Sequence, residues 1–381
     1  MAKFDLVLKN GLVIDPALSI NSVMDIAFKE GRVADLAPSI SGKNANEVKN
    51  VSGCILTPGL IDLHTHVYKG GTSIGIAPDE YCSNSAVTTV IDTGSAGPGN
   101  FEGFRDHVIK KATVRVLAFL HVSHAGIFGF SENVMVGESE DLRLMDPISA
   151  VKVVKANTDL IVGIKVRLGK WASGTQGMTP FHYARQVAET TNLPLMVHID
   201  HPPPSYREVV SSLNKGDILT HCFRPFPNSP VLEDGEILPE VLAAREKGVY
   251  FDIGHGMASF SFNVAKKMID QKFFPDTISS DVHAMCVNGP VYDLLVTMSK
   301  FYYLGMPMEE IVRATTETPA RILSRDTLGS FQKGSPGDAS ILKLESGSFN
   351  FSDSEGYEVV GQNRFTKQGL VINGRLWDGL V

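Results

Sequence analysis

The sequence predicts an α/β protein: a (β/α)8 TIM barrel with a small β-sandwich formed by the N- and C-terminal segments. Two observations support this prediction. Eight short runs rich in β-branched residues alternate with helical stretches, and their starts lie roughly 25 to 45 residues apart, the length of one βα unit. Both ends of the chain instead carry short strand patterns interrupted by glycines, without helical periodicity.

The barrel strands are predicted in chain order from these eight runs: Leu60–His64, Val87–Asp92, Val114–Leu120, Leu160–Val166, Leu193–Ile199, Asp217–Cys222, Val249–Ile253 and Thr277–Asp281. A doubly wound open sheet is the competing fold. It requires a GxGxxG turn after an early strand, and the glycines between Gly97 and Gly103 have the wrong spacing.

The two ends of the chain are predicted to fold together. At the start, the hairpin strands are Phe4–Lys9, Leu12–Asp15 and Asp25–Ala37, the last turning at Glu30-Gly31-Arg32. At the end, the short strands are Asp338–Leu344, Tyr357–Gly361 and Phe365–Ile372. Because neither set could bury a face alone, we expect residues 1–56 and 327–381 to form one β-sandwich domain, with residues 57–326 as the barrel.

Composition favours a protein that acts on small molecules. The 381 residues are 43% hydrophobic, enough for a sizeable core, and the net charge of −7 is spread without a basic block, which argues against nucleic acid or membrane as a partner. Neither a membrane-spanning run nor a signal-peptide core is evident, so we expect a cytoplasmic location. The four cysteines form no CxxC pair, which argues against a disulfide scaffold or a thiolate zinc cluster.

The strongest local signal is the HxH pair, His64 and His66, at the end of the first barrel strand. Residues two apart on a strand point the same way, so both imidazoles should project together at the C-terminal mouth of the barrel. Four more donors lie toward the C-terminal ends of later strands: Lys165, His198, His221 and Asp281. A lone histidine there is more often structural, but six donors on one rim favour one or two zinc-like ions.

Lys165 is the unusual member of this set, because a lysine in an apolar strand should have a depressed pKa. It could form an ion pair with Asp281 or Asp92. Alternatively, its neutral amine could react with carbon dioxide, giving a carbamate whose two oxygens could bridge two metals.

The run PGLIDLHTHVYKGGTSIGIAPDEYC and the segments DTGSAGPGNFEGF, GIKVRLG, VHIDHPPP, THCFRPFPN, FDIGHG and SSDVH resemble the amidohydrolase superfamily. Within it they resemble the dihydroorotase-like amidohydrolase/deacetylase subgroup. The resemblance implies that His64 and His66 bind the more buried zinc with Asp281, that His198 and His221 bind the more exposed one, and that carbamylated Lys165 bridges the two.

The resemblance also implies a mechanism. A hydroxide between the two metals is nucleophilic because the cations lower the pKa of bound water, and the exposed zinc polarises the substrate carbonyl. Asp281 is then the catalytic residue that carries the proton to the leaving group.

Tyr68 is a departure from similar dihydroorotases, which usually carry an arginine there for the substrate carboxylate. We expect Tyr68 to be a pocket wall or a donor to the oxyanion. Arg167 and Arg224 are the candidates for binding a substrate carboxylate, with ordinary ion pairing as the alternative for each. His255, between two glycines, and His283, which could instead orient Asp281, complete the candidate substrate site.

Together these features predict a zinc-dependent hydrolase that cleaves an acyl group, acetyl first among them, from an amide or ester of a small carboxylate-bearing substrate through a metal-bridging hydroxide. A cyclic amidase of the dihydroorotase or hydantoinase kind and a non-catalytic scaffold with the hydantoinase fold are the alternatives. A serine hydrolase is a weaker one, because Gly71-Thr-Ser73-Ile-Gly75 matches GxSxG without the flanking strand and helix. The expected partners are the small-molecule substrate and further copies of the chain in a homo-oligomer.

Overall fold

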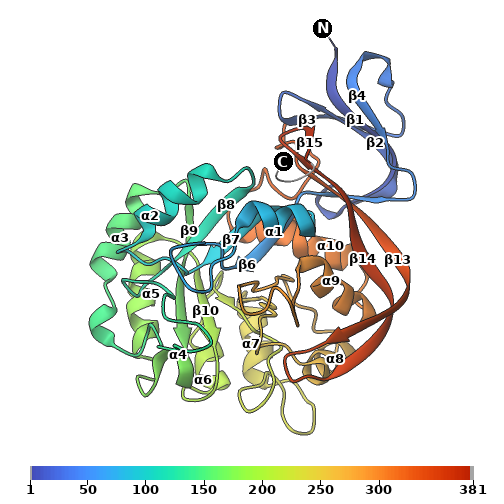
Figure 1. Cartoon of the computed structure of the whole chain (residues 1–381). Helices are drawn as coiled ribbons and strands as arrows, with labels where there is room; N and C mark the ends of the chain where they lie inside the picture. Colours follow the sequence, from blue (N-terminus) through green and yellow to red (C-terminus); the bar gives the residue numbers. More distant parts are fainter. Residues whose placement is uncertain (1, 378–381) are drawn as a thin grey trace.

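The computed structural model describes residues 2–377, which form two β-sheets with helices around one of them. Figure 1 shows the strands from the two ends of the chain, blue and red, side by side at the upper right, with the parallel sheet and its helices below them. Among the described residues, no helix is long and apolar enough to cross a membrane.

The parallel sheet has seven strands in chain order, each hydrogen-bonded to the next. They are β6 (Leu60–Thr65), β7 (Val87–Thr93), β8 (Arg115–His121), β9 (Ile161–Leu168), β10 (Leu195–Ile199), β11 (Ile218–Leu219) and β12 (Tyr250–Phe251). Each begins within two residues of its predicted start, and β6 to β9 are buried almost throughout, as expected for a parallel sheet covered on both faces.

The sheet curls until its two edges approach each other. A parallel bridge joins Asp252 to Thr277, beyond β12, and another joins Val282 to Thr65 of β6. The predicted eighth strand, Thr277–Asp281, is therefore wrong as a regular strand, because only single bridges form there. Asp281 adopts a left-handed backbone with φ of 52°, which interrupts the extended conformation that a continuous ladder requires.

The helices lie in the connections between these strands and in the segment that follows the last of them. The α-helices are α1 (Pro78–Ser85), α2 (Phe101–His107), α3 (Pro147–Ala156), α4 (Lys170–Ser173), α5 (Thr179–Thr191), α6 (Tyr206–Ser211), α7 (Pro239–Lys247), α8 (Phe262–Asp270), α9 (Leu294–Tyr303), α10 (Met308–Thr315) and α11 (Glu317–Ile322). Short 3-10 turns lie at Pro16–Leu18, Gly42–Asn44, Ile109–Lys111 and Leu142–Leu144. Apolar helix faces and the strands share one large buried core.

The strands from both chain ends form one mixed sheet in the order β15-β14-β13-β5-β1-β2-β3, with β4 also paired to β1. Their bounds are β1 (Phe4–Asp15), β2 (Ile20–Lys29), β3 (Arg32–Ala37), β4 (Ala45–Asn50), β5 (Ile55–Pro58), β13 (Ala339–Ser352), β14 (Glu358–Ile372) and β15 (Arg375–Leu376). Antiparallel pairing of β5 with β13 confirms that the two ends fold together. The β-sandwich itself is not confirmed, because every one of these strands belongs to a single hydrogen-bonded sheet.

Two pairs of predicted terminal strands are continuous in the structure. Phe4–Lys9 and Leu12–Asp15 are both part of β1, which is bent at Asn10 (φ 63°) where the register with β2 shifts. Tyr357–Gly361 and Phe365–Ile372 likewise belong to β14. Irregular positions within one strand thus produced the sequence breaks. Gly59 links β5 of the terminal sheet to β6 of the parallel sheet. The domain limits predicted above, residues 1–56 with 327–381 and residues 57–326, remain a prediction.

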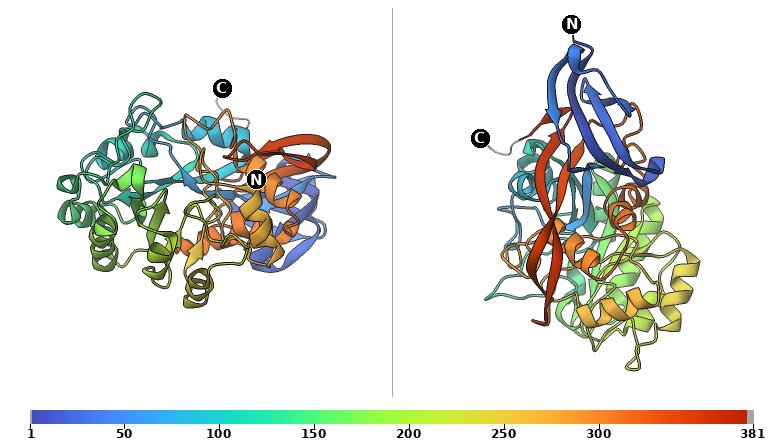
Figure 2. Two further views of the ribbon diagram at one scale, coloured as in Figure 1. Left: turned by 90° about the horizontal axis from the view of Figure 1, so that it is seen from below. Right: turned by 90° about the vertical axis from the view of Figure 1, so that its right-hand side faces the viewer.

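The hairpin of β13 and β14 is the longest element of the terminal sheet. Figure 2 (right) shows it extending past that sheet and down along the helices. β14 packs against α9 on the way. At the far end, Ser354 and Phe260 exchange hydrogen bonds, and the Asp353 carboxylate accepts from the backbone of Phe262. The hairpin therefore supports the loop before α8.

Candidate metal centre

All six predicted metal ligands line one cavity of about 420 Å³. His64 and His66 come from the end of β6, Lys165 from β9 and His198 from β10. His221 follows β11, and Asp281 lies where the curled sheet closes on β6. All six side chains therefore lie at one cavity, as the sequence led us to expect, although the distances between neighbouring members of the set differ.

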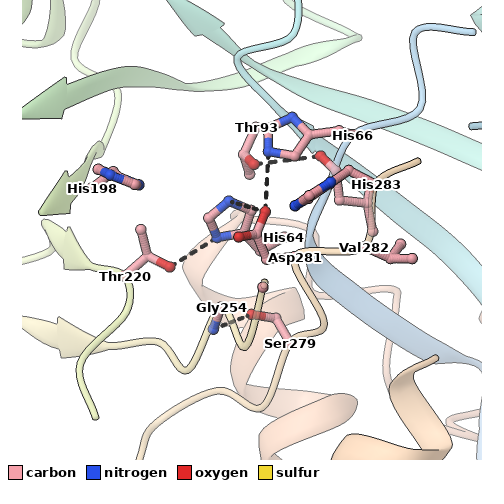
Figure 3. Close-up of polar contacts among 12 residues, drawn as sticks. His64, His66, Thr93, His198, Thr220, Gly254, Ser279, Asp281, Val282 and His283 are labelled. Atoms are coloured by element: carbon pink, nitrogen blue, oxygen red, sulfur yellow. Dashed lines mark hydrogen bonds and ion pairs between the residues drawn. The ribbon is translucent and has the colours of Figure 1, made fainter. Parts of the chain in front are cut away.

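His64, His66 and Asp281 form the tightest group. Asp281 Oδ1 lies 3.3 Å from His64 Nε2 and 3.1 Å from His66 Nε2 (Figure 3). Ligands held tetrahedrally at 2.0–2.1 Å from a zinc ion are about 3.3 Å apart, so this spacing suits three ligands of one ion. Asp281 Oδ1 is buried and has no hydrogen-bond partner, as expected for an oxygen atom that binds a cation. The three residues fit a metal site.

The charges of this group suit metal binding. Burial lowers the pKa of His64 to about 4, and the nearby Lys165 charge acts in the same direction, so the imidazole is neutral at physiological pH. Burial alone would raise the pKa of Asp281, but its interactions with His64 and His66 outweigh the effect of burial and hold that pKa well below its usual value. A neutral imidazole and an ionised carboxylate are the forms that bind metals.

Lys165 is fully buried beside this group. Its Nζ lies 3.4 Å from His64 Nε2 and 3.4 Å from Met196 Sδ, with no ion pair within 4.0 Å to any described carboxylate. The alternative ion pair with Asp281 or Asp92 is therefore wrong. Burial lowers the pKa of Lys165 to about 7, so much of the amine is neutral at physiological pH.

His198 and His221 are close to each other in a different way. His198 Nδ1 lies 2.7 Å from His221 Nε2, too close for both atoms to bind one ion. His221 Nδ1 donates to Gly254 O at 2.7 Å, so its Nε2 accepts from His198, and His198 Nε2 is left buried without a partner. Figure 3 shows His198 apart from the other ligands. A second metal at these two residues remains a prediction.

Three of the five candidate substrate residues line the cavity: Arg167, Arg224 and His283. Arg167 is paired with buried Glu138 at 3.4 Å. The Arg224 guanidinium is buried, donates to Ile199 O and has an unpartnered Nε. Burial lowers the pKa of Arg224 to about 10, so it stays protonated at neutral pH.

Tyr68 and His255 do not line the cavity. The Tyr68 ring packs on Phe104, and its hydroxyl donates to Asn100 O at 3.2 Å, because the chain has left β6 by this point and no longer alternates. His255 Nε2 instead lies 2.7 Å from Lys300 Nζ, on the far side of a turn between two left-handed glycines. The structure gives neither residue a direct role in the cavity.

Sequence reasoning missed several cavity residues that lie outside the strands. The apolar side chains of Phe130, Met135, Trp171 and Met257 line the cavity, and Glu138 holds Arg167 from a loop without periodicity. Ser73, the candidate serine nucleophile, is exposed, and its hydroxyl donates to the carbonyls of Phe128 and Phe130. No histidine contacts it among the described residues, which argues against a serine hydrolase.

A curled parallel sheet with histidines and an aspartate at the C-terminal ends of its strands is typical of metal-dependent α/β hydrolases. Residues 55–376 match the Amidohydrolase family, and the chain belongs to this family.

Similar proteins agree with this membership. A deacetylase from Brucella anthropi is 35% identical over 346 residues, which are 91% of this chain and 85% of that protein. A crystal structure described as an adenine deaminase is 32% identical, with a TM-score of 0.91 over 99% of this chain and 100% of the other. A crystal structure described as a dihydroorotase is also 32% identical, with a TM-score of 0.89 over 98% of each chain. The chain is a hydrolytic enzyme that acts on C–N bonds, so the non-catalytic scaffold is not supported.

Proposed function

We propose that this enzyme is a zinc-dependent deacylase that removes an acyl group, acetyl first among them, from a small carboxylate-bearing substrate. The observation that carries the proposal is one cavity that combines the His64, His66 and Asp281 group with two arginines. The deacetylase from Brucella anthropi supports the choice of acyl group. A zinc ion, when bound, would lower the pKa of a water molecule and polarise the substrate carbonyl.

Within this proposal, Lys165 carries a carbamate. The neutral amine is the form that attacks carbon dioxide: a new N–C bond forms and the amine proton passes to water. Its lowered pKa makes that form available, and its lack of a carboxylate partner leaves the nitrogen free. The carbamate oxygens would join His64, His66, His198, His221 and Asp281 as ligands for one or two zinc ions.

Asp281 is the proposed catalytic base. Its carboxylate stays ionised beside two imidazoles, so it can accept the proton of the attacking water and return it to the leaving nitrogen or oxygen. Because Asp281 also belongs to the metal group, its replacement should remove both metal binding and proton transfer.

Arg224 is the proposed partner of the substrate carboxylate, with Arg167 beside it. Both guanidiniums line the cavity, and Arg224 is held by one backbone acceptor, which leaves most of its donors free. A carboxylate is the anion whose geometry matches a guanidinium. His283 lines the wall next to His66 and completes the polar part of the cavity.

Steady-state kinetics on the zinc-loaded enzyme test this proposal. The panel is N-acetyl amino acids and O-acetyl 2-hydroxy acids, each beside its uncharged amide. We expect kcat/KM to favour the acids, and Arg224→Met to reduce it on the acids by about 10- to 150-fold, the value of one charged hydrogen bond. Arg207→Met, which removes an exposed pair with Glu240, is the matched control. Inactivity on the whole panel at full zinc occupancy would refute the proposed substrate class.

A cyclic amidase is the second candidate, and the structural similarity to a dihydroorotase supports it. Tyr68, at the position where similar dihydroorotases carry an arginine, does not line the cavity, and this argues against a dihydroorotase. Assays on dihydroorotate, hydantoin and dihydrouracil separate the two candidates, because a deacylase should leave all three rings closed.

Three further expectations belong to the same proposal. The curled sheet is a (β/α)8 barrel spanning residues 57–326, with residues 1–56 and 327–381 as the second domain. The enzyme works in the cytoplasm on a small molecule. It forms a homo-oligomer, which light scattering on the purified protein would test.

A further inference from the structure

His64 is connected to a buried carboxylate through a hydroxyl group. Its Nδ1, on the side away from Asp281, lies 2.8 Å from Thr220 Oγ1, and that hydroxyl lies 2.7 Å from Asp252 Oδ2. Figure 3 shows Thr220 on one side of the His64 ring and Asp281 on the other. All four side chains are buried, so water does not compete for these hydrogen bonds.

The protons of this chain can be assigned by counting donors. Asp252 is surrounded by three hydroxyls, because Thr277 Oγ1 and Ser279 Oγ lie 2.6 and 2.7 Å from its Oδ1. Ser279 Oγ accepts from the Gly254 backbone at 2.9 Å, so its own proton points to Asp252. A carboxylate so surrounded is an acceptor only. The single Thr220 hydroxyl proton is therefore donated to Asp252 Oδ2, and Thr220 Oγ1 can only accept a hydrogen bond from His64 Nδ1.

We propose that Asp252 and Thr220 are positioning residues that fix the tautomer of His64, with the proton on Nδ1 and the free lone pair of Nε2 aimed at the metal position. This inference rests on the proposed function for the metal itself. The tautomer matters because an imidazole binds a metal only through an unprotonated nitrogen. With the other tautomer, a proton on Nε2 would point at Asp281 and Lys165, where the ion belongs.

His66 also has a hydroxyl group behind its ring. Its Nδ1 lies 2.9 Å from Ser95 Oγ, and the Ser95 backbone N–H donates to the buried Asp92 carboxylate at 2.8 Å. Both imidazoles of the HxH pair thus have a hydroxyl at Nδ1. The Nε2 atoms of both rings face Asp281 Oδ1, at 3.3 and 3.1 Å.

Zinc affinity, measured by competition with a chelating dye, tests the relay without any assay of activity. We expect Thr220→Val and Asp252→Asn to raise the zinc Kd by about 10- to 100-fold, the usual effect of losing a partner behind a ligating histidine. Thr220→Ser keeps the hydroxyl and should restore the affinity to within about threefold of wild type. Thr277→Val is the matched control. The Thr277 hydroxyl also donates to the Asp252 carboxylate, but it does not hydrogen-bond His64.

The tautomer itself is read from long-range 1H–15N NMR spectra of the metal-free protein. We expect wild-type His64 to carry its proton on Nδ1, and Asp252→Asn to populate the Nε2–H form. Equal zinc affinity in Thr220→Val, Asp252→Asn and Thr277→Val, or a wild-type His64 protonated on Nε2, would overturn the relay. A wild-type protein that binds no zinc would instead refute the metal in the proposed function, and the NMR result would still decide the relay.

Discussion

Replacing Lys165 with methionine should make the metal-free protein more stable. Lys165 is fully buried, and its Nζ finds only an imidazole nitrogen and a thioether at 3.4 Å. A methionine side chain is similar in length to that of lysine, and it carries no charge that folding would have to remove from water. The buried lysine therefore costs stability in the metal-free protein.

The magnitude follows from the pKa. Burial lowers the pKa of Lys165 from 10.5 to about 7, so between these values the unfolded chain holds a proton that the native protein has released. Native stability therefore rises with pH across this window. Each pH unit corresponds to about 1.4 kcal/mol, so Lys165→Met should be about 4 kcal/mol more stable at pH 7. This advantage should fall toward zero as the pH approaches 10.

Urea unfolding from pH 6 to pH 10, with chelator present and carbon dioxide removed, measures this difference. Lys266→Met is the control, because Lys266 is exposed and pairs with Asp270 at 2.9 Å. Removing a charge that stays in water should leave the unfolding free energy almost unchanged across this pH range. A Lys165→Met protein that is no more stable than wild type at pH 7, or a difference independent of pH, would refute the reasoning.

Two further outcomes follow from the site. Tyr68→Phe should leave kcat/KM within about twofold of wild type, because the Tyr68 hydroxyl donates to Asn100 O outside the cavity. The lost hydrogen bond should lower only the free energy of unfolding, by about 1 kcal/mol. A loss of more than tenfold in kcat/KM would place Tyr68 at the substrate. Burial raises the pKa of Asp62 to about 7. Between about pH 4 and pH 7 the native state therefore holds a proton that the unfolded chain has lost. As the pH rises through this range, the Asp62 carboxyl reduces the free energy of unfolding by up to about 4 kcal/mol. Asp62→Asn should remove that part of the pH dependence in thermal unfolding, and an unchanged profile would contradict the raised pKa.

The parts of the site that follow regular strands could be predicted from the sequence. His64 lies on β6 and His66 is the first residue after it, so their shared side followed from the two-residue period of a strand. Tyr68 lies three residues beyond the end of that strand, where periodicity no longer applies. His255 turns away because Gly254 and Gly256, with φ of 46° and 53°, reverse the chain on either side of it.

The remaining contacts depend on tertiary structure. Asp281 reaches His64 only because the curled sheet brings residue 282 beside residue 65. Glu138 contacts Arg167 from a loop, and Trp171 lines the cavity from the one-turn helix α4, so neither belongs to a segment with a periodic signal. The relay from His64 to Asp252 likewise joins residues at the ends of three separate strands, so no local pattern could have indicated it.

The most direct test of the account is zinc content per chain, measured by plasma emission spectrometry on protein grown with added zinc and bicarbonate. We expect one or two zinc ions in the wild type and a loss of zinc in Asp281→Asn, an isosteric change that removes the negative charge beside His64 and His66. Circular dichroism is the control that tests whether the variant is folded. Equal zinc in both proteins, or a wild type that hydrolyses its substrate without metal, would contradict the central claim.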